Sequence, residues 1–97
     1  MNVTLLAPAE EELEDAFDHY ERERKGLGLE LLYEFRRGVD QILQHPHAWQ
    51  PLDPVYRRCR VHRFPFGIVY RLSPDADQVV IAAFMHLSRT PRSWPHE

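Results

Sequence analysis

Residues 55–72 read Val-Tyr-Arg-Arg-Cys-Arg-Val-His-Arg-Phe-Pro-Phe-Gly-Ile-Val-Tyr-Arg-Leu, and this stretch decides the fold class. Alternate side chains of a β-strand share a face, so the residues from 55 to 64 divide into two sets. One face is expected to carry Tyr56, Arg58, Arg60, His62 and Phe64. The opposite face is expected to carry Val55, Arg57, Cys59, Val61 and Arg63. Residues 66–72 predict a second strand, with Ile68, Tyr70 and Leu72 on one side.

The segments on either side of this stretch complete a sheet. Ser73-Pro74-Asp75-Ala76-Asp77 has strong turn chemistry. The run from Val79 to Met85 is apolar on both faces, which is typical of a central strand. Before the stretch, residues 46–54 contain three prolines and are expected to form a loop.

Two amphipathic helices are predicted in the first half of the chain. A short strand over residues 3–6 precedes a helix of about 15 residues that begins near Pro8 and carries an apolar stripe of Leu13, Ala16, Phe17 and Tyr20. Gly26 and Gly28 interrupt the pattern. A second stripe then follows, formed by Leu27, Leu31, Phe35, Val39 and Ile42. Pro46 ends this helix, because the residue before a proline is pushed out of the α region.

These elements predict one α+β domain that spans residues 1–97, in the order β-α-α-β-β-β. A chain of 97 residues is too short to bury two separate cores. The short glycine-containing link predicts an antiparallel hairpin of the two helices. Neither helix can bury its stripe against the other alone, so a sheet is expected to cover them.

Charge divides unevenly along the chain. Residues 1–54 hold 12 acids and 5 bases, a formal charge of −7, whereas residues 55–97 hold 3 acids and 7 arginines, a formal charge of +4. An acidic half joined to a basic half indicates two surfaces with different partners. The plainer explanation is that helices collect glutamate, and it accounts for the acidic half better than for the arginines. With a single cysteine, no long apolar run and no signal-peptide pattern, we expect a cytoplasmic protein that does not enter membranes.

Several motifs, taken in order, resemble the ParE/RelE superfamily of bacterial toxins over nearly the whole chain. They are the helix ending at Tyr20 with Gly26-Leu27-Gly28 after it, the strand 57–60, the segment 63–70, and residues 86–92 closing on Trp94. The resemblance implies a helical hairpin packed on a twisted antiparallel sheet. It also implies the toxin of a type II toxin–antitoxin system, neutralised by a cognate antitoxin in a hetero-oligomeric complex. ParE-like members block DNA gyrase and RelE-like members cut messenger RNA in the ribosome, and fold alone does not decide between these targets.

RNA cleavage would require a base, an acid and cations that stabilise the phosphorane. The resemblance places Arg58 and Arg60 at matching strand positions and Arg89 at a matching basic position near the C-terminus. At Gly67, by contrast, RelE-like nucleases tend to carry an arginine. Their C-terminal tyrosine has no equivalent here, although Trp94 is nearby. Arginine stays protonated, so the candidates for acid or base are His62 and His86.

Structural roles compete with each of these functional ones. The arginines of residues 57–63 fit a solvated strand face or one that is ion-paired with helix acids. His62 fits an exposed strand position, His86 a local hydrogen bond, and Tyr70 and Cys59 the core. The histidine spacing makes a poor zinc set, so neither a metal nor a cofactor is expected.

The leading hypothesis is a toxin that inhibits growth by binding DNA gyrase. Its target-binding surface would consist of Arg57, Arg58, Arg60, Arg89, Arg92 and Trp94. The first alternative is a ribosome-dependent endoribonuclease that uses Arg58, Arg60 and Arg89 with His62 or His86. The second is a degenerate toxin that serves only as a scaffold for its antitoxin. For the antitoxin itself, we expect an apolar groove where the hairpin meets the sheet.

Overall fold

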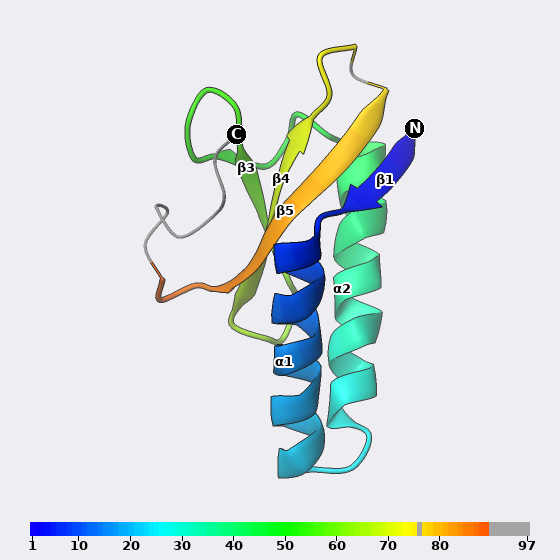
Figure 1. Ribbon diagram of the computed structural model, residues 1–97, viewed down its shortest axis with the longest axis vertical. Helices are drawn as coiled ribbons and strands as arrows, with labels where there is room; N and C mark the ends of the chain where they lie inside the picture. Colours follow the sequence, from blue (N-terminus) through cyan, green and yellow to red (C-terminus); the bar gives the residue numbers. More distant parts are fainter. Residues whose placement is uncertain (76, 90–97) are drawn as a thin grey trace.

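A computed structural model describes residues 1–75 and 77–89. The helical hairpin lies along one face of the sheet and extends beyond its lower end (Figure 1). In chain order the elements are β1 (Asn2–Leu5), α1 (Ala7–Glu23), α2 (Leu27–Gln44), β2 (Gln50–Pro51), β3 (Arg57–Arg60), β4 (Phe66–Leu72) and β5 (Gln78–His86). The predicted α+β class and order are confirmed, with β2 as an added two-residue strand inside the predicted loop.

The sheet is mixed rather than wholly antiparallel. Its strand order is β1-β5-β4-β3-β2, and β1 pairs with β5 in parallel while the other neighbours are antiparallel. The predicted antiparallel sheet is therefore corrected at this one edge. Strand β1 is separated from β5 by all the other helices and strands of the chain. A connection of this length permits parallel pairing.

The hairpin is closed by two contacts between its helices. The Glu21 carboxylate of α1 accepts hydrogen bonds from the backbone N–H groups of Gly26 and Gly28, each at 2.9 Å. It thereby caps the first turn of α2, whose N–H groups have no partner within the helix. Gly28 lies inside α2 rather than in the link, and a Cβ there would stand 2.7 Å from a ring carbon of Phe17. Its small size allows the helices to approach this closely.

Two clusters of buried side chains lie on opposite faces of the sheet. The larger one, under the helices, includes Leu31, Ile42, Cys59, Ile68, Tyr70 and Phe84. The smaller one, on the outer face, consists of Tyr56, Val69, Ala82, Ala83 and Met85. A register shift opposite Val69 and Tyr70 lets both alanines of β5 face outward. The apolar pattern of residues 79–85 follows from this two-sided burial.

Strand β3 is shorter than the sequence predicts, and Phe64 lies on the other side from the one expected. The chain turns at Arg63, whose φ is +73°, so the two-residue alternation ends before Phe64. Phe64 consequently packs under the helices, with its ring 5.0 Å from the ring of Tyr20. Arg63 is held in this turn by Glu30 of α2, through a hydrogen bond of 2.7 Å.

Candidate functional site

Two of the predicted arginines, Arg58 and Arg60, share the outer face of the sheet. Their register partners on β4 are Val69 and Gly67. The guanidinium of Arg58 donates to the Gln50 side chain at 3.0 Å, and Arg60 is exposed. A Cβ at Gly67 would lie 2.7 Å from both Cγ and Cδ of Arg58. The stem of Arg58 therefore occupies the space above Gly67, and a longer side chain there would have to displace it.

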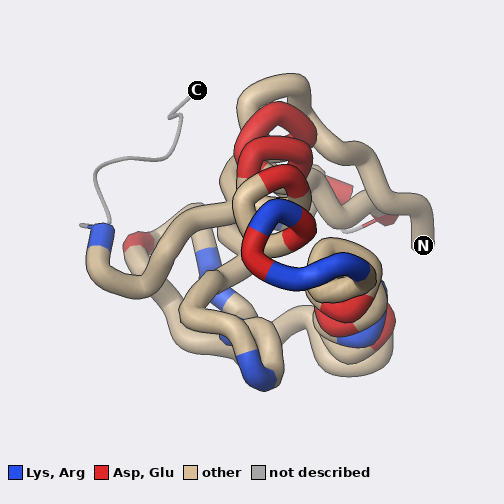
Figure 2. The backbone as a smooth tube through the Cα atoms, turned by 90° about the horizontal axis from the view of Figure 1, so that it is seen from below, with Lys and Arg blue, Asp and Glu red and all other residues tan. Residues whose placement is uncertain are grey.

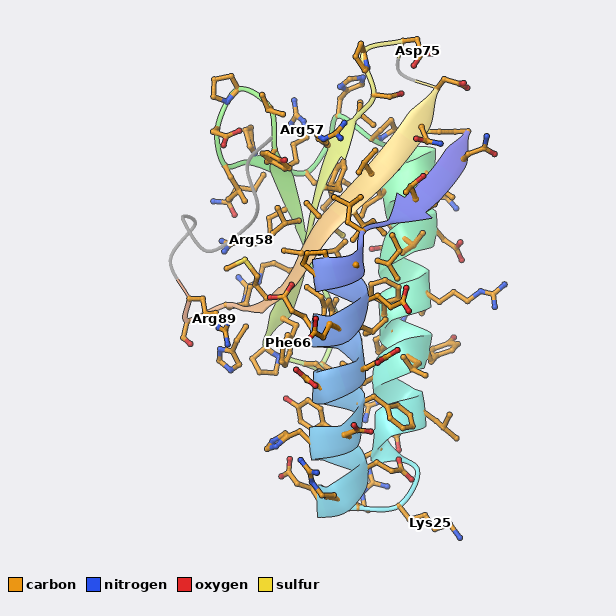
Figure 3. The ribbon with its side chains drawn as sticks, in the orientation of Figure 1. Lys25, Arg57, Arg58, Phe66, Asp75 and Arg89 are labelled. Carbon is orange, nitrogen blue, oxygen red and sulfur yellow. The ribbon has the colours of Figure 1, made fainter. Side chains whose placement is uncertain are left out.

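Arg57 alternates with Arg58 and Arg60 along β3, and its guanidinium group binds the backbone of a neighbouring loop. One guanidinium nitrogen donates to the backbone carbonyl of His47 at 3.1 Å and to that of Trp49 at 2.8 Å. In Figure 3, Arg57 lies toward the opposite end of the sheet from Phe66 and Arg89. Its side chain ties the 45–49 loop to β3, so at least part of its donor capacity serves the fold.

The loop between β3 and β4 contains His62 and Arg63. His62 is exposed. Arg63 pairs with Glu30 at 2.7 Å and approaches Glu34 at 4.0 Å, and Glu34, only 4% exposed, also pairs with Arg37 at 3.3 Å. The hydrogen bond from Arg63 is the main cause that lowers the pKa of the Glu30 carboxyl. The expectation of ion pairs to helix acids is thus confirmed for Arg63, whose role is to fasten the loop to α2.

A pocket of about 490 Å³ lies between α1 and the end of β5, and it receives His86 and Arg89. Its wall on α1 is formed by Glu12, Asp15, Ala16, His19 and Tyr20, and its wall on the sheet by Phe66, Phe84, His86, Ser88 and Arg89. The aromatic rings make a continuous layer: Phe66 stacks on Phe84 at 4.8 Å, and His86 meets Phe66 edge-on at 5.4 Å. Carboxylates, imidazoles and aromatic rings therefore converge on one cavity.

Two polar groups in this pocket are held in place. The carboxylate of Glu12 accepts a hydrogen bond from the backbone N–H of Phe84 at 3.1 Å. Burial raises the pKa of Glu12, against the lowering effects of that hydrogen bond and of the charge on Arg89. Nδ1 of His86 accepts from the backbone N–H of Ser88 at 3.1 Å and lies 2.8 Å from its hydroxyl. Neutral His86 consequently carries its proton on Nε2.

On the other side of α1, the predicted apolar groove runs from the hairpin to the sheet edge. One part, between the helices, is lined by Glu10, Leu13, Glu14, Phe17, Asp18 and Leu32. The other part, beside β1, is lined by Val3, Leu5, Leu32, Phe35, Arg36, Val39 and Ile81. Leu32 belongs to both parts, so they form one surface. Apolar side chains cover its floor, and acidic residues of α1 stand at its rim.

The comparison with protein families identifies the chain. Residues 3–91 match the model of the ParE toxin of the type II toxin–antitoxin system parDE. The chain belongs to the ParE toxin family. A solved structure titled "Chromosomal ParDE TA system from P. aeruginosa" is similar in fold, with a TM-score of 0.75 and 18% sequence identity over 89% of this chain and 95% of that chain. The comparison with curated proteins finds no match.

In this ParE-family chain the predicted site residues are distributed over both faces of the sheet. Arg58 and Arg60 lie on the outer face, whereas His86 packs against Phe66 on the helix side and lines the pocket with Arg89. Arg92 and Trp94 lie outside the described residues. The fold places His86 on the opposite side of the sheet from Arg58 and Arg60, and it places His62 in the exposed loop after β3.

Two residues with possible reactivity belong to the core of the ParE fold. Cys59 is fully buried, and burial raises the pKa of its thiol to about 11. Tyr70 is also fully buried, donates its hydroxyl to the Pro46 carbonyl at 2.6 Å, and has a pKa raised by burial to about 12. The core positions expected for both residues are confirmed. In the part of the chain that the structure describes, no cluster of three metal-binding side chains and no helix able to cross a membrane is present.

The sequence pattern missed Glu12 and Asp15 as site residues. Both belong to a run of acids in α1 that reads as a solvated helix face. Their spacing of three residues places them on one side of the helix, but nothing in the sequence says that β5 ends beside that side. Only the docking of α1 against the sheet distinguishes Glu12 from its neighbours Glu10 and Glu11.

Proposed function

We propose that this ParE-family chain is a growth-inhibiting toxin that acts by binding DNA gyrase rather than by cutting RNA. The observation that carries the proposal is the separation of Arg58 and Arg60 from His86 by the sheet itself. A general acid or base must come within hydrogen-bond reach of the proton it moves. Arg58 and Arg60 on one face and His86 on the other do not make a single active site.

Gly67 supports the same choice between binding and cleavage. The position where RelE-like nucleases tend to carry an arginine is covered here by the stem of Arg58. The outer face therefore lacks a cation at the position of Gly67. Arginine is enriched among residues that dominate the energy of protein interfaces, and it does not need to transfer a proton in that role. Arg58 and Arg60 on the outer face therefore fit a contact surface for a protein target. Arg89, Arg92 and Trp94 stay candidate contact residues from the sequence.

The antitoxin is proposed to occupy the apolar groove that includes Leu32. An amphipathic segment would bury its apolar side chains on Leu13, Phe17 and Leu32. The rim acids Glu10, Glu14 and Asp18 favour basic residues along the edge of that segment. Strand β1 is an edge strand of the sheet that the described residues form, and it borders the same groove, which also permits an added strand.

The test is to induce the chain alone in a bacterial host and to follow DNA and protein synthesis by pulse labelling. Gyrase binding predicts that DNA synthesis falls first, with messenger RNA intact, and that the purified chain inhibits supercoiling. Early arrest of translation with cut messenger RNA would refute the proposal. Normal growth would refute both gyrase binding and RNA cleavage. The remaining hypothesis would be a degenerate toxin that serves only as a scaffold for its antitoxin.

A ribosome-dependent ribonuclease is the second candidate, and the pocket gives it some support. His86 and Arg89 lie there together with Glu12, whose pKa is raised by burial. A titratable ring, a cation and a carboxyl are groups that phosphoryl chemistry uses. This candidate predicts that His86→Gln abolishes toxicity while antitoxin affinity is retained. A toxic His86→Gln variant would exclude it.

A further inference from the structure

We propose that the pocket between α1 and the end of β5 binds an arginine side chain supplied by a partner protein. The pocket joins two carboxylates, Glu12 and Asp15, to an aromatic wall that contains Phe66 and Tyr20. A guanidinium group is the protein side chain that matches both, because it forms paired hydrogen bonds to carboxylates and stacks on aromatic faces. The proposal concerns this pocket alone and does not depend on gyrase as the target.

The carboxylates have acceptor capacity left for a guest. Glu12 uses Oε1 to accept from the Phe84 N–H, and a carboxylate has two oxygens with about four lone-pair sites. Asp15 lies one helical turn further along on the same side of α1 and is exposed at the rim. The N–H donors of one guanidinium group can therefore reach Glu12 inside the pocket and Asp15 at its edge.

The charge around Glu12 is out of balance in the free chain. Burial, Asp15 and Glu11 all disfavour its ionised form, and Arg89 compensates only in part. Arg89 is within electrostatic range of Glu12, but no ion pair within 4.0 Å joins them among the described residues. A second cation that enters the pocket would give Glu12 the direct partner that it lacks. The carboxylate has already lost part of its hydration on folding, so less hydration remains to be lost on binding.

The aromatic wall suits the flat guanidinium. Phe66 is half-buried and lies almost parallel to Phe84, with 8° between the ring planes. Tyr20 approaches Phe66 edge-on, with its ring centre at 6.3 Å, and His86 does so from another side. A cation over such rings is attracted by their π-electrons, and arginine is more weakly hydrated than lysine. The wall thus favours arginine over lysine.

The surroundings discriminate against an anionic ligand such as a nucleotide. The pocket lining contains two carboxyl groups, Glu12 and Asp15, and one arginine, Arg89. Acidic residues are concentrated along α1, whereas Lys and Arg lie near the end of α1, in the link to α2 and in other segments (Figure 2). The local field attracts cations to this side of the helix and repels phosphate groups.

The test is a titration of the isotope-labelled chain, made by cell-free synthesis, with N-acetyl-arginine amide and, separately, with its neutral isostere N-acetyl-citrulline amide. Arginine should shift the amide signal of Phe84 and the ring signals of His86 saturably, with a dissociation constant on the order of millimolar. Citrulline should leave them unchanged. Lysine amide should bind more weakly than arginine.

Two variants make the result specific to the pocket. Glu12→Gln keeps an oxygen that can accept from the Phe84 N–H, so the fold is retained, and it should weaken arginine binding about tenfold. Glu14→Gln removes the same charge from the apolar groove on the other side of α1 and should leave arginine binding unchanged. An overlay of the amide spectra verifies that both variants are folded.

Three outcomes would overturn the proposal. Equal shifts with arginine and citrulline would mean that charge is not recognised. An unchanged affinity in Glu12→Gln would place the binding site elsewhere. Stronger binding of guanosine monophosphate than of arginine amide would assign the pocket to a nucleotide. None of these results bears on growth inhibition, so failure here and failure of the gyrase proposal are distinguishable.

Discussion

The two sides of helix α1 offer a contrast within one secondary-structure element. Toward α2, the residues Leu13 and Phe17 line an apolar groove whose charges stand at the rim. Toward the end of β5, the residues Glu12, Asp15 and His19 line a pocket in which the charges lie against aromatic rings. The remaining apolar stripe of α1 is buried against the sheet, and the groove and the pocket lie on either side of it.

The two sides of α1 suit different tasks. The groove is suited to binding affinity, and the pocket is suited to discrimination between partners. Apolar area buried in a groove stabilises a complex without demanding one geometry. Charged groups in a pocket contribute less net free energy but reject partners that leave them unpaired. In a ParE-family toxin, the groove is therefore expected to dominate antitoxin affinity, and the pocket to discriminate among side chains.

The largest effect is expected from Leu32→Glu, which places a charge where the two parts of the groove meet. Antitoxin binding should weaken roughly 100-fold, which equals about 2.7 kcal/mol. Calorimetry on the purified pair measures it. Leu29→Glu is the matched control, because Leu29 is on the same helix, 63% exposed and outside the groove lining. Equal losses in the two variants would show that the antitoxin does not use this groove.

Gly28→Ala should come next, because it forces the two helices of the hairpin apart. The added Cβ would lie 2.7 Å from the Phe17 ring and 2.9 Å from the Phe17 backbone oxygen, and the backbone cannot yield as a side chain does. The clash outweighs the helix propensity gained with alanine, so we expect a loss of about 2 kcal/mol in the free energy of unfolding.

Urea denaturation measures this loss, and Gly38→Ala provides the comparison. Its Cβ would meet Ile68 Cδ1 at 2.8 Å, which is the far end of a flexible side chain. The cost there should be below about 1 kcal/mol, since alanine also improves helix propensity. A Gly38→Ala variant less stable than Gly28→Ala would contradict the account of the hairpin.

Arg57→Ala should lower stability by about 1 kcal/mol, because it removes the donor shared by the carbonyls of His47 and Trp49. Arg60→Ala, on the exposed part of the same strand, should change stability little. Toxicity should follow the opposite order if Arg60 contacts the target and Arg57 serves the loop. Thermal unfolding and growth assays of the two variants separate these roles.

The smallest effect, and the one with the opposite sign, is expected from Glu12→Gln. Burial raises the pKa of Glu12 in the folded chain, so its ionised form destabilises the fold at pH values above that pKa. Glutamine removes this cost, and the variant should be slightly more stable than the parent at pH 7.5. The advantage should shrink as the pH falls through the pKa of Glu12, because the parent then becomes neutral too. Urea denaturation at pH 7.5 and pH 4 measures it, and a destabilised variant at pH 7.5 would contradict this reading.

The amino-acid sequence determined the elements whose pattern is local. The stripes of Leu13 to Tyr20 and Leu27 to Ile42 predicted both helices, and residues 66–72 predicted β4 with its observed bounds. The two-sided apolar run from Val79 to Met85 predicted a central strand, and β5 lies between β1 and β4. These patterns are reliable because burial imposes the period of each element on its own residues.

Only the tertiary structure decided which elements meet, and that decided the site. The positive φ of Arg63 moved Phe64 to the helix side, and the stem of Arg58 filled the space above Gly67. The parallel pairing of β1 with β5 and the docking of α1 beside the end of β5 selected Glu12 from a run of similar acids. Periodicity defines how an element is rotated about its own axis, but not which neighbour it faces, because that choice depends on contacts between residues far apart in the chain.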